Sequence, residues 1–245
     1  MQSLLKRLGT ACAVFVLFAA VSRAQAPIPD DAKAIEAAKP AAMAELTARR
    51  DAFVKATQAS GLPCAIAPPK LALTDIASYG NYEPETNTLQ SPIWELLKPE
   101  ERQIFFRLAG PDADESAARR EFETGAHHWV FIHEMGHWWQ ACRKVNDGRK
   151  PYAFEYEADR IDAAYWREAD PAIDPHMAPK FQGLMDRAPN PVPVGQDTAT
   201  YFNDNYEKLG PTPAYIWFQA QMCVKVFEET PAPTFLQTLR ETGKP

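Results

Sequence analysis

The sequence lacks most of the short patterns by which enzymes and binding proteins are first recognised. Its 11 glycines form no glycine-rich phosphate loop, and neither a serine-nucleophile motif nor an internal repeat is present. Its four cysteines include no C-x-x-C pair, which argues against a cysteine zinc site. Beyond the N-terminal region, no segment is apolar for long enough to span a membrane. The sequence therefore does not indicate a protein that binds phosphate with a glycine-rich loop, an enzyme with a serine nucleophile, or a protein that spans a membrane.

The N-terminal residues have the three regions of a secretory signal peptide. Lys6 and Arg7 give a basic start, residues 8–21 form an apolar run, and small residues follow. The apolar run is short for a membrane span. We predict cleavage after Ala24, which makes residues 1–24 the signal peptide and the mature protein periplasmic or extracellular.

Residues 25–245 are predicted to form one domain, because about 220 residues can bury one substantial core. Removal of the signal peptide takes away three basic residues and no acid, so the formal charge moves from −6 to −9. An acidic chain argues against nucleic acid and anionic membrane surfaces as partners. The mature chain keeps Cys64, Cys142 and Cys223, of which two can pair in an oxidising compartment, and all three pairings remain open.

One stretch, Val130–Trp139, reads VFIHEMGHWW and contains an HExxH motif. Four helical residues advance about 400°, so His133 and His137 share a face about 6 Å apart and can bind one metal ion. Glu134 lies about 100° away, the position of a general base that reaches a water without binding the metal. The flanking residues are uncharged, and a metal would offset the cost of burying these polar groups.

A third ligand is expected in the segment PYAFEYEADRIDAA, where the acidic candidates are Glu155, Glu157, Asp159 and Asp162. A histidine that binds a metal needs an acceptor for its other ring nitrogen, often a carboxylate. Glu155 has Asp159 one helical turn on, whereas Glu157 and Asp159 are followed there by apolar residues. We therefore predict Glu155 as the third ligand and Asp159 as the acceptor that holds an imidazole. Glu157 is predicted to lie on a solvated face, and Asp162 is interpreted in the same way.

HEMGH followed by EYEAD resembles the gluzincin zinc metallopeptidases, whose pattern is HExxH and then ExxxD on a second helix. Within that group the chain is most similar to small exported bacterial metallopeptidases. The specific match covers about residues 130–164, and a weaker one at residues 82–89, YEPETNTL, resembles the strand region ahead of the motif. A metzincin would need Gly and His where Gln140 and Arg143 stand, so His176 is not supported as its third ligand.

The resemblance implies an α+β, mainly α-helical, zincin-like fold. A small β-hairpin or sheet would precede a long HExxH helix, and a second helix would carry Glu155. The residue patterns agree, with strands within residues 71–91, a turn at EPETN and one helix over residues 112–144. Other helices are expected at residues 31–60 with a break at Pro40, 92–110 with a split at Lys98-Pro99, 155–168, 213–229 and 231–241, and a proline-rich loop at 188–200.

The implied function is that of an exported zinc metallopeptidase, an endopeptidase with one Zn²⁺ per chain that acts on a protein or peptide. Zinc would polarise the scissile carbonyl and lower the pKa of its water to about 7, and Glu134 would pass the proton to the leaving amine. Tyr206 and Tyr215 are candidates to steady the oxyanion, although a tyrosine is more often a packed residue. The alternatives are a catalytically silent zinc-containing binding or scaffold protein, and an enzyme kept latent by residues 27–60.

Overall fold

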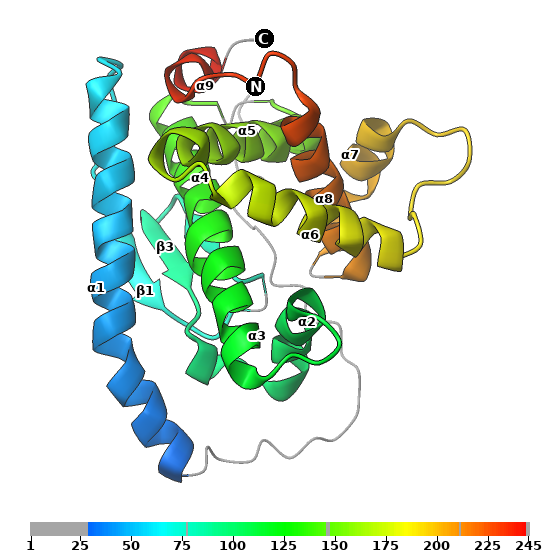
Figure 1. The fold of residues 1–245 in the computed structure, drawn as a ribbon. Helices are drawn as coiled ribbons and strands as arrows, with labels where there is room; N and C mark the ends of the chain where they lie inside the picture. The colour runs from blue at the N-terminus through cyan, green and yellow to red at the C-terminus, as the bar shows by residue number, and fades with distance from the viewer. Residues whose placement is uncertain (1–28, 77, 146–147, 211, 244–245) are drawn as a thin grey trace, which may run out of the picture.

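The computed structural model describes residues 29–76, 78–145, 148–210 and 212–243. These residues form a mainly helical structure with one small three-stranded sheet, as predicted. The predicted signal peptide lies outside the described residues. The sheet lies between α1 and α4, while α6, α7 and α8 lie on the far side of α4 (Figure 1). None of the described helices has the length and apolar character that membrane crossing requires.

The elements follow one another in a fixed order along the chain. They are α1 (Pro29–Ala59), β1 (Lys70–Leu73), β2 (Asn81–Glu83), β3 (Thr88–Ser91), the 3₁₀ turn η1 (Trp94–Leu96), α2 (Pro99–Ala109), α3 (Glu115–Phe122), the π-helical segment η2 (Glu123–Val130), α4 (Phe131–Cys142), α5 (Pro151–Ala169), α6 (Ile173–Arg187), α7 (Thr198–Leu209), α8 (Pro213–Glu228) and α9 (Phe235–Glu241).

Helix α1 continues through Pro40, so the predicted break at that residue is wrong. The surrounding alanine, lysine and glutamate residues are strong helix formers, and an interior proline can kink a helix without ending it. The ribbon changes direction in this N-terminal part of α1 (Figure 1). Further on, Leu46 and Phe53 are fully buried in the main core. This half of α1 is part of the folded domain, which counts against residues 27–60 as a removable inhibitory segment.

The sheet has the strand order β1-β3-β2. Strands β2 and β3 form the predicted hairpin, with Tyr82 opposite Leu89 in antiparallel register. Strand β1 runs parallel to β3. Tyr82 and Leu89 are buried in the core that the sheet shares with α4, which fixes the register of β2 beside the HExxH helix.

The predicted helix over residues 112–144 is confirmed as a continuous helical stretch that comprises α3, η2 and α4. Its middle part is π-helical, a wider coil that often occurs at functional sites. Within it, a ring nitrogen of His127 lies 2.8 Å from the Pro92 carbonyl and one of His128 lies 2.8 Å from the Glu123 carbonyl. Both rings therefore contact backbone carbonyl groups, and neither belongs to the His-His-Glu group that the HExxH motif helps to form.

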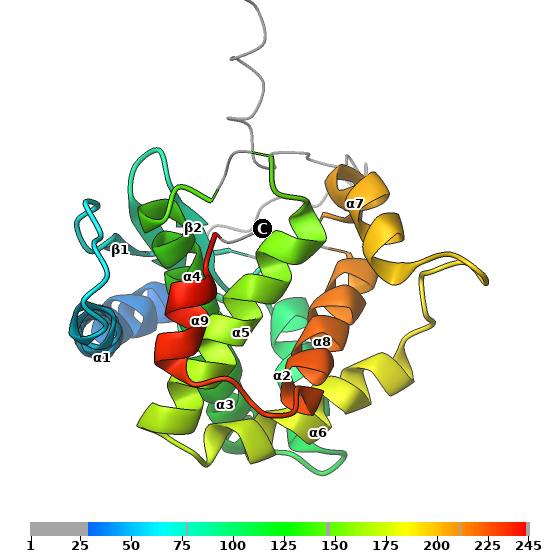
Figure 2. The ribbon, with the colours of Figure 1, turned by 90° about the horizontal axis from the view of Figure 1, so that it is seen from above.

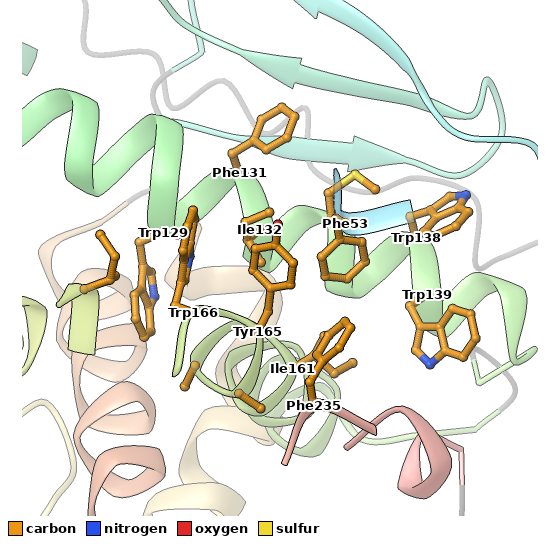
Figure 3. Packing of buried hydrophobic residues seen from close by; sticks show 14 of the residues in the cluster. Phe53, Trp129, Phe131, Ile132, Trp138, Trp139, Ile161, Tyr165, Trp166 and Phe235 are labelled. Carbon is orange, nitrogen blue, oxygen red and sulfur yellow. The ribbon is translucent and has the colours of Figure 1, made fainter. Parts of the chain in front are cut away.

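The main core forms where α4 crosses α5. Figure 3 shows its large side chains converging from four helices and the π-helical segment: Phe53, Trp129, Phe131, Ile132, Trp138, Trp139, Ile161, Tyr165, Trp166 and Phe235. Gly136 permits the close approach of the two helices, because a Cβ there would lie 3.2 Å from the Ala158 Cα. This contact sets how near the histidines of α4 come to the acidic residues of α5.

Helix α5 is enclosed, with α4 and α9 on one side and α8 on the other (Figure 2). Helices α8 and α9 lie where they were predicted, but α6 and α7 were not foreseen. Helix α6 contains Pro175 and Pro179, which predicted breaks, and α7 begins at Thr198, within the predicted loop of residues 188–200. A disulfide joins Cys64 to Cys142, with 4.9 Å between the Cα atoms, and Cys223 is buried outside it. The disulfide ties the end of α4 to the segment that follows α1.

Candidate metal centre

The three predicted metal ligands, His133, His137 and Glu155, meet at the crossing of α4 and α5. The Nε2 atoms of His133 and His137 lie 3.0 Å apart. The Glu155 Oε2 atom lies 3.2 Å from the first of these nitrogens and 3.5 Å from the second. These three side chains are at most 11 % exposed. Their donor atoms all lie within 4.8 Å of one another, so the group can hold one metal ion.

The hydrogen bonds around the two rings favour a metal between them. The Nδ1 atom of His133 lies 2.8 Å from Asp159 Oδ1, and that of His137 lies 2.7 Å from Gln140 Oε1. A neutral ring that donates from Nδ1 carries a lone pair on Nε2. Two such lone pairs at 3.0 Å repel each other unless a proton or a cation lies between them. Two histidines and one glutamate are also a usual ligand set of catalytic zinc.

Protons compete for the same atoms. Burial alone would lower the pKa of His133, but the Asp159 and Glu155 carboxylates outweigh burial and hold that pKa well above its ordinary value. Burial alone would raise the pKa of Glu155, but hydrogen bonds from the two imidazoles hold it well below its ordinary value. The metal-free group is therefore an ion pair, and a metal must displace a proton from it.

Glu134 is buried next to the ligand group but is not part of it. Its Oε2 accepts a hydrogen bond of 2.7 Å from the backbone N–H of Tyr82 in β2. Gly80 precedes this strand, and a Cβ there would lie 3.1 Å from Glu134 Cγ and 2.5 Å from Val130 Cγ1. Local sequence patterns do not predict these two contacts, because the contacts join segments about 50 residues apart.

Both candidate tyrosines lie near Glu155, the predicted third ligand. The Tyr206 hydroxyl donates to Glu155 Oε1 over 2.9 Å. The Gln219 amide donates to Glu155 Oε2 over 3.1 Å and to the Tyr215 hydroxyl over 2.8 Å. Burial, together with the negative charge of Glu155, raises the pKa of Tyr215 well above its ordinary value, so its hydroxyl stays protonated. Gln219 was missed because no local motif marks it.

The prediction that Glu157 and Asp162 lie on a solvated face is wrong. Glu157 is buried, accepts a hydrogen bond of 2.9 Å from Gln140 and forms an ion pair of 3.0 Å with Arg149. Asp162 is fully buried, and burial raises its pKa well above the ordinary value. The residue pattern predicts one solvated face for this segment, whereas α5 has neighbouring helices on several sides.

Comparison of the chain with models of protein families, with curated proteins and with solved structures finds no match. The described residues form a mainly helical structure in which two crossing helices assemble a buried His-His-Glu group. Membership of the gluzincins stays a prediction from the two sequence motifs.

Proposed function

We propose that this protein is an exported zinc metallopeptidase with a zincin-like fold, and that it cleaves peptide bonds within protein or peptide substrates. The observation that carries the proposal is the position of Glu134, a buried carboxylate beside the His-His-Glu group and outside it. A zinc ion that serves only the structure needs no such carboxylate, whereas peptide hydrolysis needs a base at this place.

In this proposal His133, His137 and Glu155 hold the zinc ion. The ion, when bound, supplies Lewis acidity, which polarises a carbonyl and makes a water more acidic. Glu134 removes the proton from the attacking water and delivers it to the nitrogen of the leaving amine. The Tyr82 N–H holds one oxygen of Glu134, which keeps the base in a single orientation during both transfers.

Two further features support a peptide substrate. Strand β2 lies at one edge of the described sheet and carries the N–H that holds Glu134, so an extended peptide paired with this edge would lie beside the base. The protonated Tyr215 hydroxyl lies near Glu155 and can donate to an oxyanion. A predicted signal peptide ahead of an acidic mature chain fits a protein that acts outside the cytoplasm.

Metal analysis joined to digestion of a broad peptide library tests the proposal. The purified mature protein should contain about one zinc per chain and cleave peptides internally. A chelator should stop the cleavage, and added zinc should restore it. A zinc-loaded protein that cleaves no peptide would favour the alternative, a catalytically silent binding or scaffold protein. Mass spectrometry of the exported protein should place its N-terminus near Gln25.

A further inference from the structure

We infer that Gln140 is a positioning residue for the metal centre: Gln140 keeps the proton of His137 on Nδ1 and leaves the lone pair of His137 on Nε2. Glu157 in turn sets the direction of the Gln140 amide. The inference builds on the metal site of the proposed function and is independent of whether the protein cleaves peptides. It also gives a role to Glu157, a buried carboxylate that the proposed mechanism does not use.

Gln140 is fully buried on α4, one turn after His137. Its Oε1 lies 2.7 Å from His137 Nδ1. Its Nε2 donates to the Phe154 carbonyl over 2.8 Å and to Glu157 Oε2 over 2.9 Å. Each hydrogen of the amide therefore has its own acceptor, and the amide oxygen is the atom that faces the imidazole.

The reverse orientation of the amide is excluded by its neighbours. A flipped Gln140 would place its oxygen against the Phe154 carbonyl and the Glu157 carboxylate, which are both acceptors. An amide oxygen cannot donate, so the ring nitrogen that faces it must carry the proton. The lone pair of His137 is then left on Nε2, the atom that points toward His133 and Glu155.

Glu157 is itself held in place from another part of the chain. Its Oε1 pairs with Arg149 over 3.0 Å and accepts the backbone N–H of Gly243 over 3.3 Å. The Phe154 ring stacks on the His137 ring with the centroids 4.7 Å apart and the planes 16° from parallel. The network thus fixes both the tautomer and the plane of His137.

The two histidines are held by groups of different charge. Asp159 holds His133 with a carboxylate, whereas Gln140 holds His137 with a neutral amide. A carboxylate at position 140 would stand about as close to Glu157 as the amide does now, 2.9 Å, and like charges at that distance repel. Glutamine is therefore the residue that accepts from the imidazole and donates to the carboxylate.

Zinc affinity, measured by competition with a chelator, tests the inference. Gln140→Met keeps the length of the side chain and removes the acceptor, and we expect zinc to bind about 10-fold to 100-fold more weakly, as for other groups that hold metal ligands. The matched control is Gln221→Met, because Gln221 is also buried but bonds to Tyr152 instead of to the centre, and its zinc affinity should equal that of the parent.

Exchange of the two groups separates positioning from packing. Gln140→Glu alone should weaken zinc binding, because two carboxylates then face each other. Gln140→Glu combined with Glu157→Gln restores one donor and one acceptor between the two positions, so the double variant should bind zinc more tightly than Gln140→Glu alone. The recovery should be partial, because an oxygen at position 140 would still face the Phe154 carbonyl. A purely structural role for these residues predicts no such recovery.

Nitrogen-15 NMR of the metal-free parent supplies a readout that needs no variant. At a pH where the ring is neutral, His137 should carry its proton on Nδ1, and Glu157→Gln should increase the Nε2–H form. A proton on Nε2 of the parent would overturn the inference, as would a Gln140→Met variant that binds zinc as tightly as the parent does. If zinc binds as inferred but no peptide is cleaved, only the proposed peptidase activity fails.

Discussion

Glu134 accepts a hydrogen bond from the backbone N–H of Tyr82, with 2.7 Å between Oε2 and the nitrogen. The proposed base lies on α4, but the group that orients it lies on β2, about 50 residues earlier in the chain. The three proposed metal ligands, by contrast, all lie on α4 and α5. Changes at the β2 edge should therefore affect catalysis while they leave metal binding intact.

Gly80→Ala tests this separation. The new Cβ would meet Val130 Cγ1 at 2.5 Å and Glu134 Cγ at 3.1 Å, so either the strand or the base must move. A shift of about 1 Å at a catalytic group can lower the rate about 100-fold, and overpacking costs about 1–3 kcal/mol of stability. We expect kcat to fall strongly with zinc content unchanged. Gly125→Ala is the control, because its Cβ would make only an ordinary contact with Phe105 at 3.6 Å.

The part of the site that could be predicted from the sequence depends on local spacing. Two histidines four residues apart share a helix face whatever surrounds them, and the same spacing relates Glu155 to Asp159. The structure places all four side chains together. The small sheet, its turn and the continuous helix that carries the motif were likewise predicted from local patterns, as was the mainly helical fold.

The rest depends on contacts between distant segments, which local patterns do not encode. Glu157 was predicted to be solvated, because nothing near it in sequence shows that Arg149 and Gln140 would bury it as partners. Gln219 reaches Glu155 from a helix 64 residues away. Pro40 was predicted wrongly for a different reason. A proline predicts a break, but the strong helix formers around Pro40 allow α1 to continue past it.

Asp159→Asn should weaken zinc binding about 10-fold to 100-fold, because the carboxylate that holds His133 Nδ1 over 2.8 Å becomes an amide that can turn its NH₂ toward the ring. Chelator competition measures the change. The ligand variants His133→Ala, His137→Ala and Glu155→Ala should lose far more affinity. Equal losses for Asp159→Asn and Glu155→Ala would contradict the assignment of Glu155 as a ligand.

Tyr206→Phe should lower zinc affinity more than it lowers kcat. Its hydroxyl donates to Glu155 Oε1 over 2.9 Å, so its removal frees one oxygen of the proposed third ligand. We expect a modest loss of zinc affinity and a kcat close to that of the parent at saturating zinc. Tyr215→Phe should show the opposite pattern, with zinc affinity kept and kcat lowered. If Tyr206→Phe lowers kcat at full zinc occupancy, then Tyr206 contacts the reacting carbonyl.

The stability of the metal-free protein should fall as the pH rises above neutral. In the folded state burial alone would lower the pKa of His133, but Asp159 and Glu155 outweigh burial and raise this pKa well above its usual value of 6.5. A group whose pKa is raised by folding stabilises the protein below its unfolded pKa and loses that contribution as the pH passes the folded pKa. Zinc affinity should change in the opposite sense, because protons leave the ligands as the pH rises.

Thermal melting of the chelated protein from pH 6 to pH 10 measures the first effect, and zinc titration over the same range measures the second. His133→Ala is the matched variant, and it should flatten the dependence of the melting temperature on pH. A parent protein whose metal-free stability rises steadily over this range would show that His133 is not held in its charged form.

Glu134→Gln separates a peptidase from a silent zinc protein. Glutamine keeps the length of the side chain, and its amide oxygen can still accept the Tyr82 N–H, so the variant should remain folded. The ligand group does not include Glu134, so the zinc content should stay near one per chain. An amide cannot take up the proton of the attacking water, and hydrolysis should therefore fall by a factor of about 100 or more. Equal cleavage by parent and variant at equal zinc content would rule out Glu134 as the base. Cleavage by neither, with zinc bound to both, would leave the binding or scaffold function as the better account of the same buried centre.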